Sequence, residues 1–239
     1  MAVHGDKSAL IVGAGGLGCP VAVALAEAGV GHLVLVDGDR VEPSNLQRQT
    51  LFWPADVGRA KVEAARDRLA ARAPQLRITA VAERASPARL DAMLGGVDVA
   101  IDATDDPGFG FLLNDRALSL GVPAVLGGVV RFEGLVLPVA PGHGGCWRCL
   151  FEDEPAPHEV ASCGDAGVLG AMAGVVGHLQ AASALDLLAG SRHEVGVVTT
   201  IDGLRGRVRR VRVPPSEHCP ACHGAARASA PPRESASCS

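Results

Sequence analysis

Tyrosine is absent from this sequence, and aromatic residues of all kinds make up only 3% of its 239 residues. The core must therefore be aliphatic, built mainly from the abundant alanine and valine residues. Positive charge is not in excess either, because 22 lysines and arginines face 26 aspartates and glutamates, for a net charge of −4. A generally basic surface is thus excluded, and we expect neither nucleic acid nor an anionic membrane as a partner.

A secretory signal peptide and a clear membrane span are also missing. The stretch Val168–Leu188, rich in alanine and glycine, comes closest to a span, but His178, Gln180 and Asp186 interrupt it. We predict a buried core helix there. Localisation is therefore expected to be cytoplasmic.

The seven cysteines are an odd number, and without a secretory signal they argue against a disulfide framework. Four of them form two C-x-x-C pairs, Cys146 with Cys149 and Cys219 with Cys222. Each pair can present two thiolates to one tetrahedral zinc, and together they close a four-sulfur shell with no open position. The spacing therefore predicts a structural zinc site, with two unrelated redox dithiols as the alternative.

The stretch Ser8–Gln49 has the layout of a nucleotide-binding βαβ unit. A strand, a glycine-rich turn, a helix, a second strand and an acid are expected in that order at Ala9–Val12, Gly13–Gly18, Pro20–Ala28, His32–Val36 and Asp37. The start of the helix would offer free N–H groups and a positive dipole end to phosphates. A nucleotide site is the prediction, and a glycine turn that binds nothing is the alternative.

Individual residues of this unit have separate expected roles. Gly13 and Gly15 permit a tight turn and close approach of the backbone to phosphate, while Gly18 lets the helix pack closely against the strand. Asp37 follows the turn by about 20 residues, where an acid can bind a ribose hydroxyl.

Helices and strands continue to alternate along the chain, which predicts a mainly parallel sheet. Helices are expected at Lys61–Ala73, Ser86–Leu94 and Phe111–Leu120, and strands at Leu76–Val81, Val97–Ile101 and Ala124–Val129. Later strands are expected at Gly134–Val139, Glu194–Ile201 and Arg207–Val213. We predict an α/β fold with a doubly wound, Rossmann-like sheet, antiparallel C-terminal strands and a zinc site. Residues 1–222 would form one domain, and residues 223–239 a disordered tail.

Charged residues near the strand ends indicate phosphate chemistry rather than hydride transfer. Arg48, in the polar loop Ser44–Gln49, can clamp phosphate oxygens, and Lys61, at a helix start, can reach the α- and β-phosphates. Asp105 follows a strand and can hold Mg²⁺ through its carboxylate. Each residue alone has an ordinary alternative as a surface arginine, a solvated lysine or a turn-capping aspartate. Their expected convergence at the carboxyl ends of neighbouring strands favours a functional site.

The motifs GAGGLG, VDGDRVEPSNLQRQ, GRAK, DATDD, GCWRCLF and CPAC closely resemble those of the MoeB/ThiF/HesA adenylyltransferases, bacterial relatives of ubiquitin-activating enzymes. The resemblance runs from about Ser8 to Cys222. It implies that the C-terminal Gly-Gly carboxylate of a small β-grasp sulfur-carrier protein attacks the α-phosphate of ATP. Pyrophosphate would leave, and the acyl-adenylate would serve sulfur transfer in molybdopterin, thiamine or related biosynthesis. ATP, Mg²⁺ and Zn²⁺ are the implied cofactors, and a homodimer the implied assembly.

The resemblance also assigns the site residues. Catalytic roles fall on Arg48, Lys61, Asp105 and Cys163. The nucleotide would contact Gly13, Gly15, Gly16, Gly18, Asp37, Asp39, Ser44, Asn45, Arg48, Lys61, Thr104 and Asp105. Cys146, Cys149, Cys219 and Cys222 would be the zinc ligands. Cys163 is at the family's reactive-cysteine position, and both a covalent role and a dispensable thiol remain open for it.

The sequence departs from the family pattern at two places. Asp106 replaces the asparagine of the family's T-D-N motif, and the arm with an R-Y-x-R-Q-like motif is not found ahead of the first strand. No rhodanese-like domain follows Cys222, so a separate protein is expected to donate sulfur. Two alternatives stay open, a catalytically impaired scaffold that binds a carrier and a zinc-containing NAD-dependent oxidoreductase.

Overall fold

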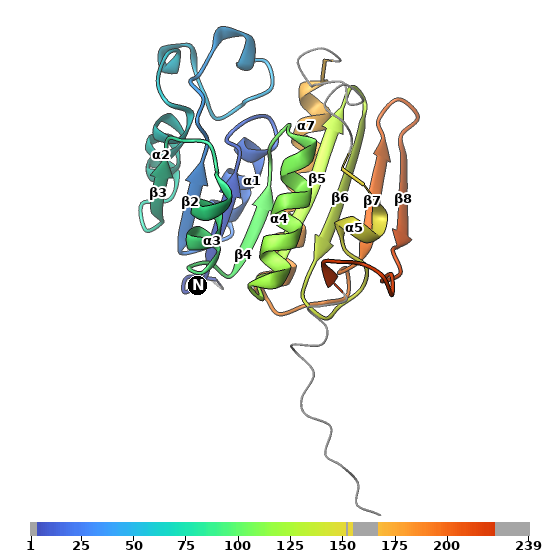
Figure 1. Ribbon diagram of the computed structural model, residues 1–239. Coiled ribbons are helices and arrows are strands. Elements are labelled where there is room, and N and C mark those ends of the chain that lie inside the picture. Colours follow the sequence, from blue (N-terminus) through green and yellow to red (C-terminus); the bar gives the residue numbers. More distant parts are fainter. Residues whose placement is uncertain (1–3, 152, 155–166, 223–239) are drawn as a thin grey trace, which may run out of the picture.

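The structure is a computed structural model that describes residues 4–151, 153–154 and 167–222. In this part of the chain, eight strands form one sheet in the order β3-β2-β1-β4-β5-β6-β7-β8 (Figure 1). Their bounds are Ser8–Val12 for β1, His32–Val36 for β2, Arg77–Val81 for β3, Val99–Asp102 for β4, Ala124–Val130 for β5, Glu133–Val139 for β6, Val197–Asp202 for β7 and Arg207–Arg212 for β8. The first five strands are parallel and the last three are antiparallel, which confirms the predicted fold class.

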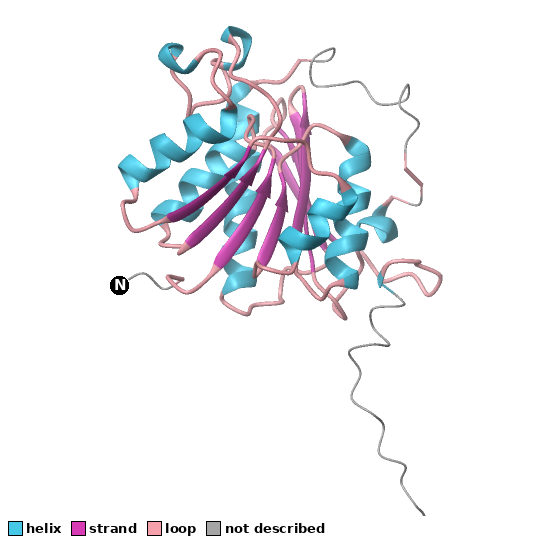
Figure 2. Ribbon diagram, turned by 60° about the vertical axis from the view of Figure 1, so that its left-hand side comes forward, coloured by secondary structure: helices cyan, strands magenta, loops and turns pink. Residues whose placement is uncertain are grey.

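Helices cover both faces of the sheet (Figure 2). One face carries α1 (Gly18–Glu27), α2 (Lys61–Arg72) and α7 (Gly170–Leu188), and the other carries α3 (Pro87–Leu94), α4 (Pro107–Ser119) and α5 (Trp147–Leu150). Alternate residues of each strand point to opposite faces, so Ala9 and Ile11 pack under α1 while Leu10 and Val12 pack on the other side. Both cores are dominated by aliphatic side chains, as the composition predicted.

Helix α7 is long and apolar enough to cross a membrane by length and composition alone. Its packing gives another reason for that composition, because Ala173, Val176 and Ala184 are buried against α1 and the sheet. Gln180 is also fully buried and donates a hydrogen bond from Nε2 to the carbonyl oxygen of Asp102. The helix is therefore part of the core, as predicted.

Several elements differ from the expectations, among them α1, which begins at Gly18 and not at Pro20, and β7, which begins at Val197 and not at Glu194. Helix α4 begins at Pro107 and not at Phe111, because Asp106 caps it by accepting a hydrogen bond from the N–H of Gly108 at 3.0 Å. Residues Trp147–Leu150, which overlap the first C-x-x-C pair, form the short helix α5, where no element was expected. The predicted tail at residues 223–239 lies outside the described residues.

Candidate functional site

A cavity of about 600 Å³ opens at the carboxyl ends of the parallel strands. In doubly wound sheets this edge is where ligands bind, at the point where the strand order reverses. Ten of the predicted nucleotide-site residues line the cavity: Gly13, Gly15, Gly16, Asp37, Asp39, Asn45, Arg48, Lys61, Thr104 and Asp105. Ser44 and Gly18 are not among the lining residues. The Ser44 hydroxyl instead donates to Oε2 of Glu42, and Gly18 lies behind the turn.

The glycine turn lies tightly against the end of β4. Gly13 has a φ of +95°, and a Cβ there would lie 2.4 Å from the carbonyl oxygen of Ala103. A Cβ on Gly18 would lie 1.9 Å from the carbonyl oxygen of Gly13, so α1 can begin here only with glycine. Gly15 faces the cavity, and its added Cβ would meet nothing closer than Nε2 of Gln49, at 3.6 Å. The turn therefore leaves an open backbone cradle at the N-terminus of α1, which fits a phosphate.

Lys61 and two carboxylates form the charged wall of the cavity. The ammonium lies 2.9 Å from Oδ2 of Asp39 and 3.7 Å from Oδ2 of Asp37. Asp37 also accepts hydrogen bonds from the N–H groups of Ala14, at 2.7 Å, and of Asp39, at 2.8 Å. The hydrogen bond from Lys61 lowers the pKa of Asp39. Only 8% of the Lys61 side chain is exposed, so this cation is held inside the site and aimed by its partners.

The long connection between β2 and α2, which carries Arg48, is held near its end by the buried carboxylate of Asp56. This group accepts hydrogen bonds from the N–H of Trp53 at 3.0 Å, from Arg59 at 3.0 Å and from Arg68 at 2.8 Å. Burial raises the pKa of Asp56, but these donors outweigh it and the net shift is downward. Earlier in the same connection, Arg48 lies beside Gly16, with Nη1 donating to the carbonyl oxygen of Ser44 at 3.1 Å.

The acidic residues after β4 have different environments. Asp106 caps α4, and an asparagine would cap a helix equally well, so this departure from the family motif is locally conservative. Asp105 lines the cavity, and within the described residues no hydrogen bond or ion pair engages its carboxylate. Oxygen donors of this kind suit Mg²⁺. Cys163 lies outside the described residues.

Asp102 and Trp147 are among the buried cavity residues that the sequence did not reveal. Burial raises the pKa of Asp102 to about 7, even though the N–H and hydroxyl of Thr104 donate to its Oδ1 at 3.0 and 2.8 Å. The indole N–H of Trp147 is buried without a hydrogen-bond partner in the described part of the chain. Both groups lie close to Gly110, where an added Cβ would be 3.2 Å from Trp147 Nε1 and 3.3 Å from Asp102 Oδ2. The DATDD and CWRC motifs contain these residues but do not show that they face the cavity.

The four predicted zinc ligands converge on the face of the sheet that carries α4. Their sulfur atoms all lie within 4.8 Å of one another, with Cys146 3.5 Å from Cys219 and Cys149 3.5 Å from Cys222. Four sulfurs at about 2.3 Å from one zinc would be roughly 3.8 Å apart, so the cluster fits a tetrahedral ion. Burial and the neighbouring Cys149 raise the pKa of Cys146 to about 12. A divalent cation is what would stabilise four thiolates packed this closely.

Asn114 links the cysteine cluster to the cavity. Its Nδ2 lies 3.7 Å from Sγ of Cys146, and its Oδ1 accepts a hydrogen bond from the N–H of Trp147 at 3.0 Å. Arg148, in the same short helix, forms an ion pair with Asp115 at 2.8 Å. The cluster therefore helps to hold Trp147 in the cavity wall.

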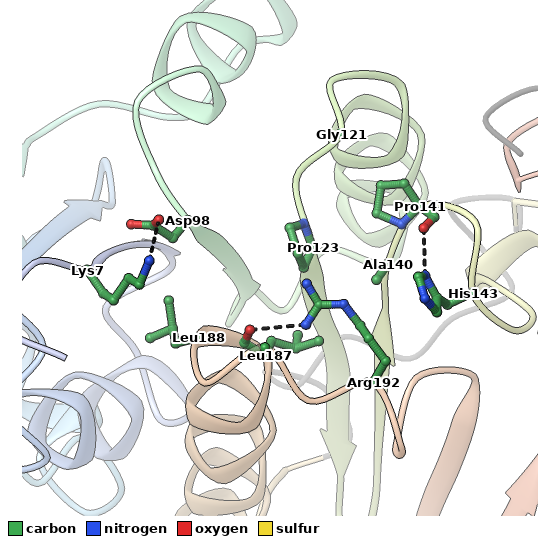
Figure 3. Close-up of a pocket in the computed structure, with 11 residues that line it drawn as sticks. Lys7, Asp98, Gly121, Pro123, Ala140, Pro141, His143, Leu187, Leu188 and Arg192 are labelled. Atoms are coloured by element: carbon green, nitrogen blue, oxygen red, sulfur yellow. Dashed lines mark hydrogen bonds and ion pairs between the residues drawn. The ribbon is translucent and has the colours of Figure 1, made fainter. Parts of the chain in front are cut away.

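A second, smaller hollow of about 360 Å³ lies near the amino-terminal ends of the parallel strands, opposite the large cavity (Figure 3). Its cations already have partners: Lys7 lies 3.5 Å from Asp98, and Arg192 donates to the carbonyl oxygens of Leu187 and Ser191 at 3.1 and 2.8 Å. The Arg192 hydrogen bonds hold the C-terminal end of α7. The Lys7–Asp98 ion pair joins the segments that lead into β1 and β4. The hollow therefore has a structural explanation, and the large cavity remains the candidate active site.

The chain matches the ThiF family over residues 5–221. It is 40% identical over 221 residues to the "Adenylyltransferase and sulfurtransferase MOCS3" of Drosophila willistoni, covering 91% of this chain and 48% of that protein. It is 41% identical over 221 residues to the "Sulfur carrier protein adenylyltransferase" of Thermus thermophilus, covering 90% of this chain and 82% of that one. The chain thus spans about half the length of the fly relative.

Among solved structures, the E. coli MccB crystal structure with ATP is similar to this fold, with a TM-score of 0.80 and 23% identity. The similarity covers 91% of this chain and 66% of that one. At this identity the likeness concerns the fold. It agrees with the predicted arrangement of one mixed sheet between two helical layers.

Proposed function

The chain belongs to the ThiF family, and from that premise we propose that it transfers AMP from ATP to the C-terminal glycine carboxylate of a small sulfur-carrier protein. The observation that carries the proposal is the cavity, where a glycine cradle, the predicted cations Arg48 and Lys61 and the carboxylate of Asp105 face one space. The names of the relatives, adenylyltransferases in both cases, support this activity over an oxidoreductase.

In the proposed complex, ATP lies across the glycine turn. Asp37 receives the ribose, and the N–H groups at the start of α1 receive phosphate oxygens. Lys61 and Arg48 neutralise phosphate charge, and the phosphates compete with Asp39 for the Lys61 ammonium. Asp105 would hold Mg²⁺, which supplies further charge neutralisation for the polyphosphate when it is bound.

The reaction itself is an in-line displacement at the α-phosphorus. A carboxylate oxygen of the carrier's last glycine forms a bond to this phosphorus, while the bond to the bridging oxygen of the β-phosphate breaks. Pyrophosphate leaves with that electron pair, and an acyl-adenylate remains. A carboxylate is a weak nucleophile that approaches a polyanion, so the rate depends on alignment and on the cations of the cavity.

The remaining groups complete the proposal. Zinc at the four cysteines is structural, because no coordination position stays open.

We place the protein in the cytoplasm, where free thiols stay reduced and ATP is supplied. A homodimer is supported by exposed apolar side chains at the end of β5 and along the start of α7, namely Val130, Phe132, Leu169 and Val175. Sulfur would come from a separate protein, for molybdopterin, thiamine or a related product. A covalent role for Cys163 stays a prediction.

Carrier-dependent exchange of labelled pyrophosphate into ATP tests the activity. The assay uses a panel of β-grasp proteins that end in Gly-Gly, each with a matched control that lacks the final glycine. Exchange with an intact carrier, and none with its truncated control, is the expected result. ATP binding without exchange across the panel would instead favour a carrier-binding scaffold.

A further inference from the structure

Strand β8 is unusual because all six of its residues, Arg207–Arg212, are exposed. It pairs with β7 along its whole length on one side, and in the described part of the chain no strand pairs with its outer edge. Figure 1 shows it as the last strand of the sheet. An unpaired edge presents a row of backbone N–H and C=O groups that can accept another strand.

The side chains of this edge are positively charged, whereas the protein as a whole has a negative net charge. Five arginines and no acid occupy residues 205–212, in a chain with a net charge of −4. Arg205 and Arg210 have acidic partners in Asp202 and Glu194. Within the described residues, no hydrogen bond or ion pair engages the guanidinium groups of Arg207 and Arg209. These two arginines alternate onto the same face of the sheet, together with Val211.

Apolar side chains accompany the free charges. Val208 is 61% exposed and Val211 is 57% exposed, which is high for valines in a strand. A strand edge that combines unpaired backbone groups, two exposed valines and two unpaired cations matches another β-strand with acidic side chains better than it matches a phosphate backbone. A nucleic acid would use the arginines but not the valines or the edge.

The register of the sheet connects this edge to the cavity. Val129 of β5 lines the cavity and pairs with Gly134 of β6. Gly134 pairs with Ile201 of β7, and Ile201 pairs with Val208 of β8. Three strand spacings of about 4.8 Å therefore place Val208 roughly 14 Å from the cavity wall. A strand added outside β8 would be about 19 Å away, a span that about six extended residues can bridge.

We propose that β8 is the docking edge for the carrier protein, which adds an acidic edge strand to the sheet and directs its C-terminal tail into the cavity. This docking site rests on the proposed function for the identity of the partner. The arginines orient the carrier, the strand edge fixes its register, and the length of its tail sets which residue reaches the ATP site.

Amide hydrogen exchange on the whole protein, with and without each carrier, tests the docking site directly. We expect carrier binding to protect about half of the β8 amides, those that point away from β7. Protection that appears elsewhere while β8 exchanges unchanged would overturn the proposal, even if pyrophosphate exchange is robust. Protection of β8 by a carrier that supports no pyrophosphate exchange would instead support docking and contradict the proposed reaction.

Charge variants provide a second, quantitative test. In Arg207→Gln/Arg209→Gln, the apparent KM or Kd for the carrier should rise about tenfold, with the KM for ATP unchanged. The matched control, Arg66→Gln/Arg72→Gln, removes the same charge from α2 beside the opposite edge strand, β3, and should leave both constants unchanged. Equal carrier binding by both variants, or no binding by any carrier, would overturn the proposal. The proposal would also be overturned if the wild type bound a 20-nucleotide single-stranded DNA probe in preference to the carriers and the β8 variant lost that preference.

Discussion

Replacing Lys61 with alanine separates catalysis from stability. The Lys61 ammonium lies in a nearly buried position between Asp37 and Asp39. In the proposed complex this positioned charge faces the reacting phosphate, so its removal should lower the rate constant of exchange by about 100- to 1000-fold. Breaking a fully buried ion pair costs about 3–5 kcal/mol, but here the cost is smaller. Asp39 is 54% exposed and Asp37 keeps two backbone donors, so we expect a loss of about 1–2 kcal/mol.

Thermal unfolding and pyrophosphate exchange measure the two effects side by side. For a chain of this size, the stability loss corresponds to a decrease in Tm of about 2–8 °C. The pKa of Asp39 is lowered by Lys61, so the stabilising contribution of this pair is present above about pH 4. It is lost as the pH falls through the folded-state pKa. The stability difference between wild type and variant should therefore shrink in acid.

Two further variants make the Lys61 prediction specific. Lys61→Met/Asp39→Asn leaves no unpaired carboxylate at Asp39, so it should recover most of the lost stability without recovering exchange. Arg66→Ala removes a cation from the exposed face of the same helix and should change neither quantity appreciably. Exchange by Lys61→Ala within tenfold of the wild-type rate would refute the assigned role of this lysine.

Two other predictions concern metal and pH. Removing zinc by chelation, or one ligand by Cys219→Ser, should lower the free energy of unfolding by several kcal/mol. The reason is that metal binding at this cluster contributes to folding. Protein purified without chelators that contains no zinc would contradict this prediction. Asp102→Asn should remove a pH dependence of stability. The Asp102 carboxyl has a folded pKa of about 7, so it binds its proton more tightly in the folded state. As the pH rises from 4 to 7, the free energy of unfolding of the wild type should fall by about 4 kcal/mol relative to that of the variant, and it should fall no further above pH 7. Unfolding curves at a series of pH values check this, and a difference independent of pH would be inconsistent with a neutral, buried Asp102.

Much of the fold could be predicted because local signals agree with the tertiary structure. Strand β2 was expected at its observed bounds, and β1 differs from its expected range by one residue. Hydrophobic runs, the glycine turn and the N-terminal proline of α3 all indicate the same arrangement. Helix α3 was expected to begin at Ser86, and Ser86 is its N-cap residue, although its hydroxyl makes no capping hydrogen bond.

The expected start of α4 was wrong because the two glycines of its first turns obscured a local start signal, the Asp106 N-cap followed by Pro107. Gly108 and Gly110 indicate a poor helix by propensity alone. The structure requires a small residue at Gly110 because Trp147 and Asp102 approach it closely. That contact joins segments that lie far apart in the sequence, so no local pattern reports it. The same reason explains why Trp147 and Asp102 were missed as cavity residues.

The candidate site was predictable where a motif carries the chemistry. The glycine turn, Asp37, Arg48, Lys61 and Asp105 come together as expected at one edge of the sheet. The sequence could not show that Lys61 is ion-paired to Asp39, or that Ser44 is directed toward Glu42. Side-chain partners depend on how a loop folds back, and no local pattern of residues reports that.

Carrier adenylation is tested most directly by the intact mass of the carrier after incubation with the enzyme, ATP, Mg²⁺ and pyrophosphatase. The carrier should gain one AMP, the label from [α-³²P]ATP should travel with it, and hydroxylamine should release AMP and leave a hydroxamate at the last glycine. ATP cleaved only to ADP and phosphate, with the mass of every carrier unchanged, would show that the carrier is not adenylylated.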